Sequence, residues 1–282
     1  MNIYTISLFF CVVLHKVSAL NILGIFPYHG KSHFFVYRVY LQELVKRGHN
    51  ITVISHFPEA HPPENYKDIS LAGSIKILED DLPFSRSYLT ILGVGLFLTN
   101  SGKENCAVLL ANQEVRKLIE NKTKYDVIVV EHFNSDCALG IAYKLKAPVV
   151  GIASHILMPW QYNRFGIPNN PSFVSYHFLE GGTKPTLWQR VERTIFDFYF
   201  NTLFYINSQR NNQLELAKYY DDIPPLEELA KEIKFVLLYH NFILTGSRLF
   251  PANVIEVGGY HVSEGKPLTG VSFQYFFSVY LQ

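Results

Sequence analysis

The stretch NILGIF, residues 21–26, begins the pattern that decides the fold. It is a short apolar run that ends at Pro27, which is typical of a strand buried on both faces of a parallel sheet. Apolar residues then recur at helical spacing from Phe34 to Val45, and Gly48 follows two basic residues as a helix stop. The run ITVIS, residues 51–55, is the next strand. A strand, a helix and a strand in this order predict a parallel pair joined by a right-handed crossover.

The same alternation continues along the chain. Further strands are expected at residues 74–78, 126–131, 148–152, 234–238 and 253–257, and helices at residues 107–120, 135–146 and 187–219. Alternating strands and helices specify an α/β fold, and we predict one open, Rossmann-like parallel sheet with helices on both faces. We place this domain at residues 20–257, because Gly258 and Gly259 open a glycine-rich segment that is typical of a linker.

Composition excludes several classes of protein. The chain has 282 residues, of which 48% are hydrophobic, 15% aromatic and 17% charged, so it is globular rather than disordered. Its net charge of +1 comes without the clustered basic face that nucleic-acid binding needs. Dinucleotide and phosphate-loop fingerprints are absent. The spacing of His and Cys suits no metal, so we expect neither a metal nor a resident cofactor.

Residues 1–19 have the pattern of a signal peptide. The apolar run Ile3–Leu14 is followed by Val17-Ser18-Ala19, the small residues that signal peptidase accepts. No Lys or Arg precedes the run, so a buried first strand or helix is the alternative. We expect the endoplasmic reticulum lumen or secretion, with no transmembrane anchor in this chain. Asn50 and Asn121 each begin a glycosylation triplet and are expected to be modified there.

Two features leave alternatives open. Cys106 and Cys137 remain after cleavage of the signal peptide, and they form either one disulfide or two buried thiols. The aromatic segment Ile195–Ile206 is either a core helix, which we favour, or a helix that lies on a membrane surface.

The loop after the first strand carries the candidate chemistry. Ligands of an open parallel sheet bind outside the carboxyl ends of its strands, so residues 27–33 face the binding crevice. Ser32 is the expected helix N-cap, and His33 follows it in the first turn. The partial positive charge of a helix N-terminus disfavours a protonated imidazole, and a neutral imidazole can act as a general base. The alternative is that His33 only caps the helix or packs in the core.

A histidine base needs an acidic partner that fixes its tautomer and stabilises the imidazolium. The strand at residues 126–131 delivers Glu131, and then Asp136, to the same rim of the sheet. Either carboxylate can reach His33. Asp136 is alternatively the cap of the following helix, and Glu131 is alternatively a solvated carboxylate at a strand end.

Taken together, these residues resemble a known family. Gly30-Lys31-Ser32-His33-Phe34, Arg47-Gly48-His49 and Val53-Ile54-Ser55 resemble the start of family 1 UDP-glycosyltransferases, the UDP-glucuronosyl- and UDP-glucosyltransferases, and are closest to the invertebrate branch. Residues 125–131 with Asp136-Cys137 resemble the middle strand of that family, and residues 253–261 resemble its exit into the interdomain linker.

The resemblance implies a GT-B architecture, of which this chain is similar to the N-terminal, acceptor-binding half. His33 matches the family's catalytic base, which takes a proton from an acceptor hydroxyl while that oxygen displaces UDP from the sugar with inversion. The resemblance slightly favours Asp136 over Glu131 as the acidic partner. The aromatic content fits a pocket for a small lipophilic acceptor.

Residues 258–282 depart from the family pattern, and we interpret them as a shortened interdomain linker and a divergent tail. The family's donor-binding half is not recognisable in this chain. One hypothesis is therefore a transferase that uses UDP-sugar as co-substrate when a second domain is supplied. Another is an inactive lumenal binding or regulatory module that associates with full-length relatives or a membrane surface. The third is a Rossmann-like binding protein unrelated to sugars.

Overall fold

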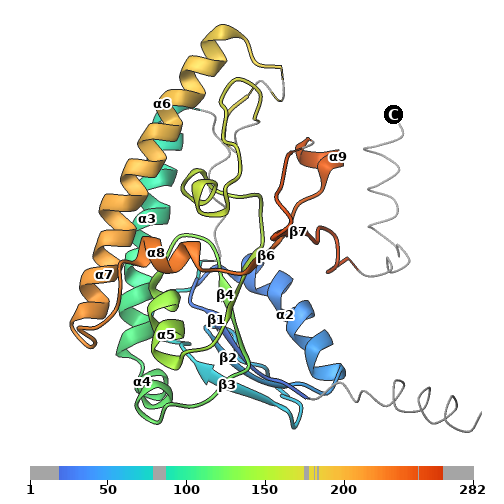
Figure 1. Ribbon diagram of the computed structural model, residues 1–282, viewed down its shortest axis with the longest axis vertical. Helices are drawn as coiled ribbons and strands as arrows, with labels where there is room; N and C mark the ends of the chain where they lie inside the picture. The colour runs from blue at the N-terminus through green and yellow to red at the C-terminus, as the bar shows by residue number, and fades with distance from the viewer. Residues whose placement is uncertain are drawn as a thin grey trace, which may run out of the picture.

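A seven-stranded parallel sheet forms the centre of the molecule (Figure 1). The computed structural model describes residues 19–78, 87–174, 178–180, 182, 184–246 and 248–262. The strands are β1 (Asn21–Phe26), β2 (Asn50–Ser55), β3 (Tyr66–Ser70), β4 (Val127–Glu131), β5 (Val149–Ala153), β6 (Phe235–Leu238) and β7 (Val254–Glu256). Their order is β3-β2-β1-β4-β5-β6-β7 and each neighbouring pair is parallel, which confirms the predicted Rossmann-like α/β fold.

Helices cover both faces of the sheet because the central strands are apolar on both sides. On one face, Ile22 and Phe26 pack against the buried side of α2 (Lys31–Lys46). On the other face, Leu23 and Ile25 belong to a larger core. That core is completed by α3 (Tyr88–Ala111), α4 (Gln113–Glu120), α5 (Cys137–Leu145), α7 (Arg210–Ala217) and α8 (Leu226–Lys231).

A second layer stands beside the sheet, where α6 (Leu187–Leu203) runs parallel to α3 and extends past it (Figure 1). A capping box starts α6: the Thr186 hydroxyl accepts from the Gln189 amide at 3.3 Å, and the Gln189 side chain accepts from the Thr186 amide at 2.9 Å. A π-helical segment, η3 (Phe204–Gln209), joins α6 to α7. The short elements are η1 (Pro159–Gln161), η2 (Asn163–Phe165) and α9 (Phe242–Thr245).

Two of the expected elements are wrong in place or extent. Residues 74–78 do not form the third strand, and Leu78 makes only an isolated bridge to Gly30. The third strand is β3, which has little apolar character because it lies at the edge of the sheet. The expected helix at residues 107–120 is two helices, because the Asn112 side chain caps a new start by accepting from the amides of Glu114 and Val115.

The remaining expected strands and helices lie within two residues of their predicted limits, although η3 interrupts the last helix. Cys106 and Cys137 form a disulfide between α3 and α5. Of the two alternatives that the sequence left open, one disulfide or two buried thiols, the structure shows the disulfide. Within the described ranges, no helix combines the length and hydropathy needed to cross a bilayer. The expected signal segment, except Ala19, and most of the expected tail lie outside the described residues.

Candidate acid–base site

The candidate site lies where the strand order of the sheet reverses. β1 pairs with β2 on one side and with β4 on the other, so the chain leaves the carboxyl ends of β1 and β4 in opposite directions. His33 follows β1 on the third residue of α2, and Glu131 is the last residue of β4. The switch point of the fold therefore brings together two residues that are 98 positions apart.

Helix α2 begins earlier than expected. Its N-cap is Gly30, which makes no side-chain capping bond, and Ser32 is inside the first turn. The prediction that Ser32 caps the helix is therefore wrong. His33 nevertheless lies in the first turn, as the sequence indicated, and its side chain contacts Glu131 at the end of β4.

His33 and Glu131 form a direct pair. The distance between His33 Nδ1 and Glu131 Oε1 is 3.1 Å, and the side chains are 19% and 3% exposed. An ionised carboxylate only accepts hydrogen bonds, so Nδ1 carries the proton in this pair and Nε2 is left as the basic nitrogen. Glu131 thus selects the tautomer that a general base at this position requires.

Three further groups hold the Glu131 carboxylate and its neighbours in place. The Tyr28 amide donates to Glu131 Oε2 at 3.2 Å, and the Tyr37 hydroxyl donates to Oε1 at 3.3 Å. The same hydroxyl accepts from the Ser154 amide at 3.1 Å. Burial, together with the charge of Glu131, raises the pKa of both the Tyr37 and Tyr28 phenols, so both stay protonated. Each oxygen of the buried Glu131 carboxylate therefore has at least one hydrogen-bond donor.

Aromatic rings enclose the imidazole. The rings of Tyr28 and Phe133 each lie 4.6 Å from the His33 ring, measured between centroids, and His155 lies 5.3 Å away. Tyr28 and Phe133 also contact each other edge to face. The imidazole of His33 therefore lies among aromatic rings.

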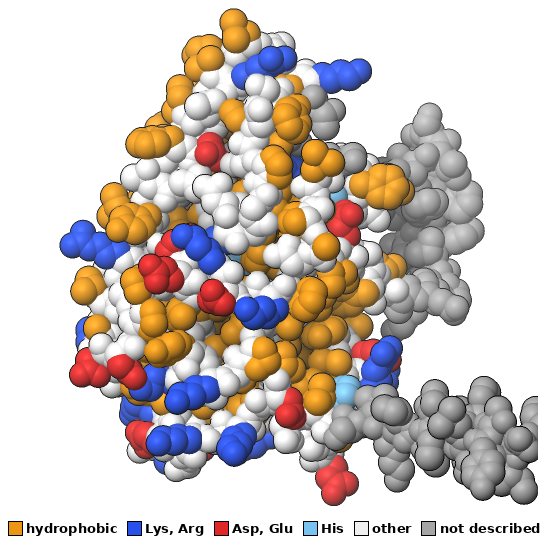
Figure 2. All heavy atoms as spheres, viewed as in Figure 1, with side chains coloured by type: hydrophobic (Ala, Val, Ile, Leu, Met, Phe, Trp, Pro, Cys, Tyr) orange, Lys and Arg blue, Asp and Glu red, His pale blue; other side chains and the backbone are white. Residues whose placement is uncertain are grey.

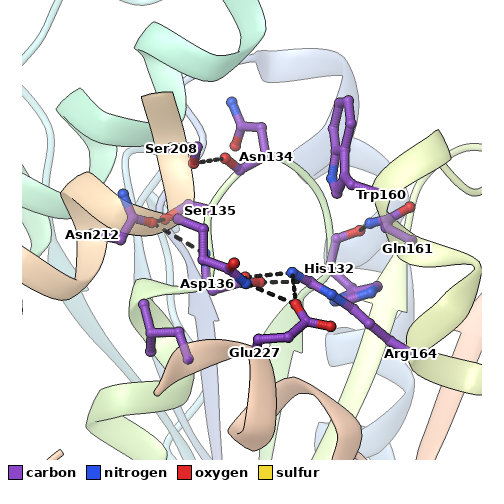
Figure 3. A network of polar contacts seen from close by, with 12 residues as sticks. His132, Asn134, Ser135, Asp136, Trp160, Gln161, Arg164, Ser208, Asn212 and Glu227 are labelled. Atoms are coloured by element: carbon purple, nitrogen blue, oxygen red, sulfur yellow. Dashed lines mark hydrogen bonds and ion pairs between the residues drawn. The ribbon is translucent and has the colours of Figure 1, made fainter. Parts of the chain in front are cut away.

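Asp136 does not pair with His33, contrary to the slight preference drawn from the family resemblance. Its two carboxylate oxygens accept from Nη1 and Nη2 of Arg164 at 2.8 and 2.7 Å (Figure 3). Gln209 donates to the same carboxylate at 2.9 Å, and Asp136 is only 2% exposed. Asp136 is the N-cap residue of α5 but makes no side-chain capping bond. Asp136 lies at the far end of the β4–α5 loop, and this position explains why its side chain pairs with buried residues of the core.

The Asp136 cluster is a structural network. Glu227 of α8 accepts from Arg164 at 3.0 Å (Figure 3). It also accepts from Gln209 at 2.9 Å. The Arg164 guanidinium also lies 5.2 Å from the centroid of the Phe204 ring. Polar side chains from the start of α5, from η3 and from α8 therefore form one network with the buried guanidinium of Arg164, which lies in η2.

Sequence reasoning missed Tyr37 and Tyr28 as parts of the site. Tyr37 lies four residues after His33, so both side chains share one face of α2 and point at the same carboxylate. That spacing was visible in the sequence. The role of the Tyr28 backbone amide was not, because it depends on where β4 ends relative to β1.

The two glycosylation candidates lie at the opposite, amino end of the strands. Asn50 is the exposed first residue of β2, and Asn121 is the exposed residue that ends α4. Both line one hollow of about 590 Å³. Neither is near His33, and over the described residues no three His, Cys, Asp or Glu side chains are arranged to hold a metal ion.

A histidine oriented by a buried carboxylate lies at the switch point of a parallel, Rossmann-like sheet, which makes the pair the candidate acid–base site of this fold. Residues 83–278 match the family model of UDP-glucoronosyl and UDP-glucosyl transferase, and the chain belongs to that family.

Relatives agree with this assignment. The chain is 28% identical over 264 residues to UDP-glucosyltransferase 2 of Dactylopius coccus, a match that covers 92% of this chain and 51% of that protein. It is 25% identical over 281 residues to the ecdysteroid UDP-glucosyltransferase of Autographa californica nuclear polyhedrosis virus, covering 92% and 53%. The chain thus spans about half the length of the curated relatives it matches.

A solved UDP-glucosyltransferase from Polygonum tinctorium, capable of glucosylating indoxyl, aligns over 93% of this chain and 57% of its own. The TM-score is 0.45 and the identity 10%.

Proposed function

We propose that this chain forms the acceptor-binding half of an inverting UDP-sugar-dependent glycosyltransferase, with His33 as the base. The pair between His33 Nδ1 and Glu131 Oε1, at 3.1 Å, carries this proposal. The pair leaves Nε2 of the imidazole free and holds the ring in one orientation, and it does so in a family named for the transfer of glucuronosyl and glucosyl groups.

In the proposed reaction, the acceptor oxygen forms a bond to the anomeric carbon of the sugar. The bond from that carbon to the UDP oxygen breaks, and UDP leaves with the electron pair. The acceptor proton moves to Nε2 of His33, and the carboxylate of Glu131 stabilises the imidazolium that results. Attack from the face opposite UDP inverts the anomeric centre. The UDP-sugar is held mainly by a second domain, as the family resemblance implies.

The acceptor is proposed to be a small lipophilic alcohol or phenol. The rings of Tyr28 and Phe133 pack against the His33 imidazole, and these aromatic surroundings of the proposed base favour an aromatic or alicyclic skeleton next to the reacting hydroxyl. Relatives named ecdysteroid UDP-glucosyltransferases fit the same broad chemistry.

The test is glycoside formation by the full chain, mixed with UDP-glucose and a panel of simple phenols, with and without the donor-binding half of a relative. We expect His33→Gln to lower the rate about 100-fold or more, because a positioned base contributes roughly that much. His61→Gln is the matched control, since His61 is exposed on the loop after β2. Transfer that survives in His33→Gln would contradict the proposal, as would phenol binding without transfer when the donor half is present.

We also propose that the chain matures in the secretory pathway. A disulfide between Cys106 and Cys137 suits an oxidising lumen, and Asn50 and Asn121 are both exposed. Expression in insect cells should yield a product whose mass falls on treatment with peptide N-glycosidase. Asn50→Gln and Asn121→Gln should each remove one glycan, and an unmodified wild-type chain would count against this location.

A further inference from the structure

A hollow of about 590 Å³, which we call the amino-end hollow, lies at the amino ends of the first three strands. Its walls are the starts of β1, β2 and β3, one side of α4, and the segment 121–125 between α4 and β4. Ligand pockets in proteins usually measure ~300–1,000 Å³, so the hollow can hold a molecule of ordinary ligand size. His33 and Glu131 lie at the opposite ends of the strands, and the proposed reaction does not use this hollow.

The lining of the amino-end hollow is polar and close to neutral. Every lining residue except Ile51 and Leu118 has a polar or charged side chain. Lys117 and Glu114 form an ion pair at 2.8 Å. The other charged residues of the lining are Lys67, Lys124 and Glu64. Figure 2 shows that charged side chains are dense over the lower part of the molecule, where Figure 1 places α4. An apolar occupant would leave these groups without partners, whereas a neutral molecule with many hydrogen-bonding groups suits them.

The hollow also has the two kinds of contact that a sugar ring uses. Tyr125 is half-buried in the wall, and an aromatic ring can pack against the C–H groups on one face of a sugar. The hydroxyl and amide groups at the edge of the sugar need hydrogen-bond partners where water is displaced. Asn21 and Thr52 are lining residues that can supply them. N-Acetylglucosamine is neutral and offers exactly such a face and such an edge, so it matches the lining.

Both glycosylation candidates open onto this hollow, and the one at Asn121 lies on a fixed turn. The backbone amides of residues 121, 122 and 123 donate to the carbonyl oxygens of residues 117, 119 and 118 at 2.9, 3.0 and 3.0 Å. The same segment continues to Tyr125, four residues further on. Asn50 lies on another wall, and its Nδ2 already donates to Asn21 Oδ1 at 3.2 Å. The turn therefore fixes the start of a glycan on Asn121 at the rim, beside the aromatic ring.

We propose that the amino-end hollow is a carbohydrate site occupied by the first N-acetylglucosamine units of a glycan on Asn121. A ligand on a short tether has an effective concentration in the millimolar range, so weak sugar contacts are sufficient to keep it bound. The glycan then covers the polar amino end of the sheet and stabilises the fold. This inference rests on the proposed maturation in the secretory pathway, and the experiments below distinguish the failure of one from the failure of the other.

Thermal unfolding of the full chain from insect cells tests the effect on stability. We expect Asn121→Gln to lower the unfolding midpoint by about 2–4 °C, because the contacts of the bound sugars are lost. The matched control is the same pair of proteins from a bacterial host with an oxidising cytoplasm, which adds no glycan and still allows the disulfide. Their midpoints should be equal. A similar loss in the bacterial proteins would assign the effect to the Asn121 side chain and overturn the proposal.

Mass spectrometry of the insect-cell protein distinguishes the two proposals. A wild type without any glycan overturns both the secretory location and this inference. A glycan on Asn50 alone overturns this inference and leaves the location standing. A glycan on Asn121 that changes neither the midpoint nor its own rate of enzymatic release also overturns this inference alone.

Release of the glycan from the folded protein tests its place in the hollow. Peptide N-glycosidase should remove the Asn121 glycan at least about tenfold faster from Tyr125→Leu than from the wild type, because the sugar loses its aromatic contact and the linkage becomes accessible. Tyr143→Leu is the matched control, since Tyr143 is 42% exposed on α5 and lies outside the hollow. Circular dichroism checks that both variants fold, and after unfolding in urea all three proteins should release the glycan equally fast. Equal rates in the folded proteins, or protection of the Asn50 glycan instead, would overturn the proposal.

Discussion

At the scale of single residues, two carboxylates five positions apart have separate roles. Glu131 ends a central strand and points at His33, while Asp136 lies past the turn and points at Arg164. Each is almost fully buried, so each needs a partner, and the partner decides the role. The sequence could place both at the same rim but could not assign them, because Arg164 reaches Asp136 only through the fold of the loop after β5.

Asp136→Asn is expected to destabilise the protein by about 3–5 kcal/mol, because the buried Arg164 guanidinium would lose its bidentate partner. Glu227→Gln is the matched control. Its side chain is 40% exposed, so its ion pair with Arg164 should contribute about 1 kcal/mol or less. Urea denaturation of the three proteins measures the difference. Equal losses in the two variants would show that Asp136 is not the main partner.

His132 should make stability depend on pH. Burial, assisted by the charge of Arg164, lowers the pKa of His132 from 6.5 to about 3, so the folded protein keeps this imidazole neutral. Between pH 6.5 and 3, the unfolded chain binds one proton more than the folded chain, and stability therefore falls as the pH falls. The free energy of unfolding of the wild type, relative to His132→Gln, should drop by about 1 kcal/mol per pH unit from pH 6 to 4. Parallel stability curves would contradict this.

At the scale of elements, one glycine allows the close approach of α3 to the β4–α5 loop. A Cβ on Gly102 would lie 1.9 Å from the backbone oxygen of Asn134, so only glycine fits there. The Ser208 hydroxyl donates to that same oxygen at 2.6 Å, which fixes η3 against the loop. The packing of these three segments thus depends on the absence of a side chain at Gly102.

Gly102→Ala is expected to cost about 2–4 kcal/mol of stability, because the loop or the helix must move to admit the methyl group. Gly93→Ala is the control on the same helix. A Cβ there meets nothing within 4 Å, so alanine should stabilise α3 by about 0.5–1 kcal/mol. Thermal or urea unfolding distinguishes the two, and a neutral Gly102→Ala would mean that the contact is not maintained in solution.

The helices between residues 187 and 217 also show what the spacing of apolar residues cannot predict. The helical spacing between residues 187 and 219 predicted a long helix, which η3 interrupts without ending it. It did not reveal that the segment Ile195–Ile206 has one apolar face in the core and another in solvent. The core interpretation is confirmed for one face of that segment, and the membrane-surface interpretation stays a prediction, because the spacing of apolar residues does not show which neighbour each of them contacts.

At the scale of the whole molecule, the disulfide links two helices on one face of the sheet. Cys106 of α3 and Cys137 of α5 are both fully buried, and the bridge closes a loop between residues 31 positions apart. Replacing both with alanine should lower stability by about 3–4 kcal/mol, mainly by freeing the unfolded chain. A reductant should lower the unfolding midpoint of the wild type toward that of the variant and leave the variant unchanged. Equal midpoints before reduction would show that the bridge does not form.

The sequence by itself determined the parallel α/β layering, the position of His33 at the start of the first crossover, and the family. These depend on local signals: apolar runs, helix stops and short motifs that neighbouring residues carry. Only the tertiary structure decided that Glu131 orients His33, that Asp136 neutralises Arg164, that the two cysteines join, and that α6 shows an apolar face to solvent. Each of these depends on contacts between residues far apart in the chain, and local spacing does not encode such contacts when several partners have the same chemistry.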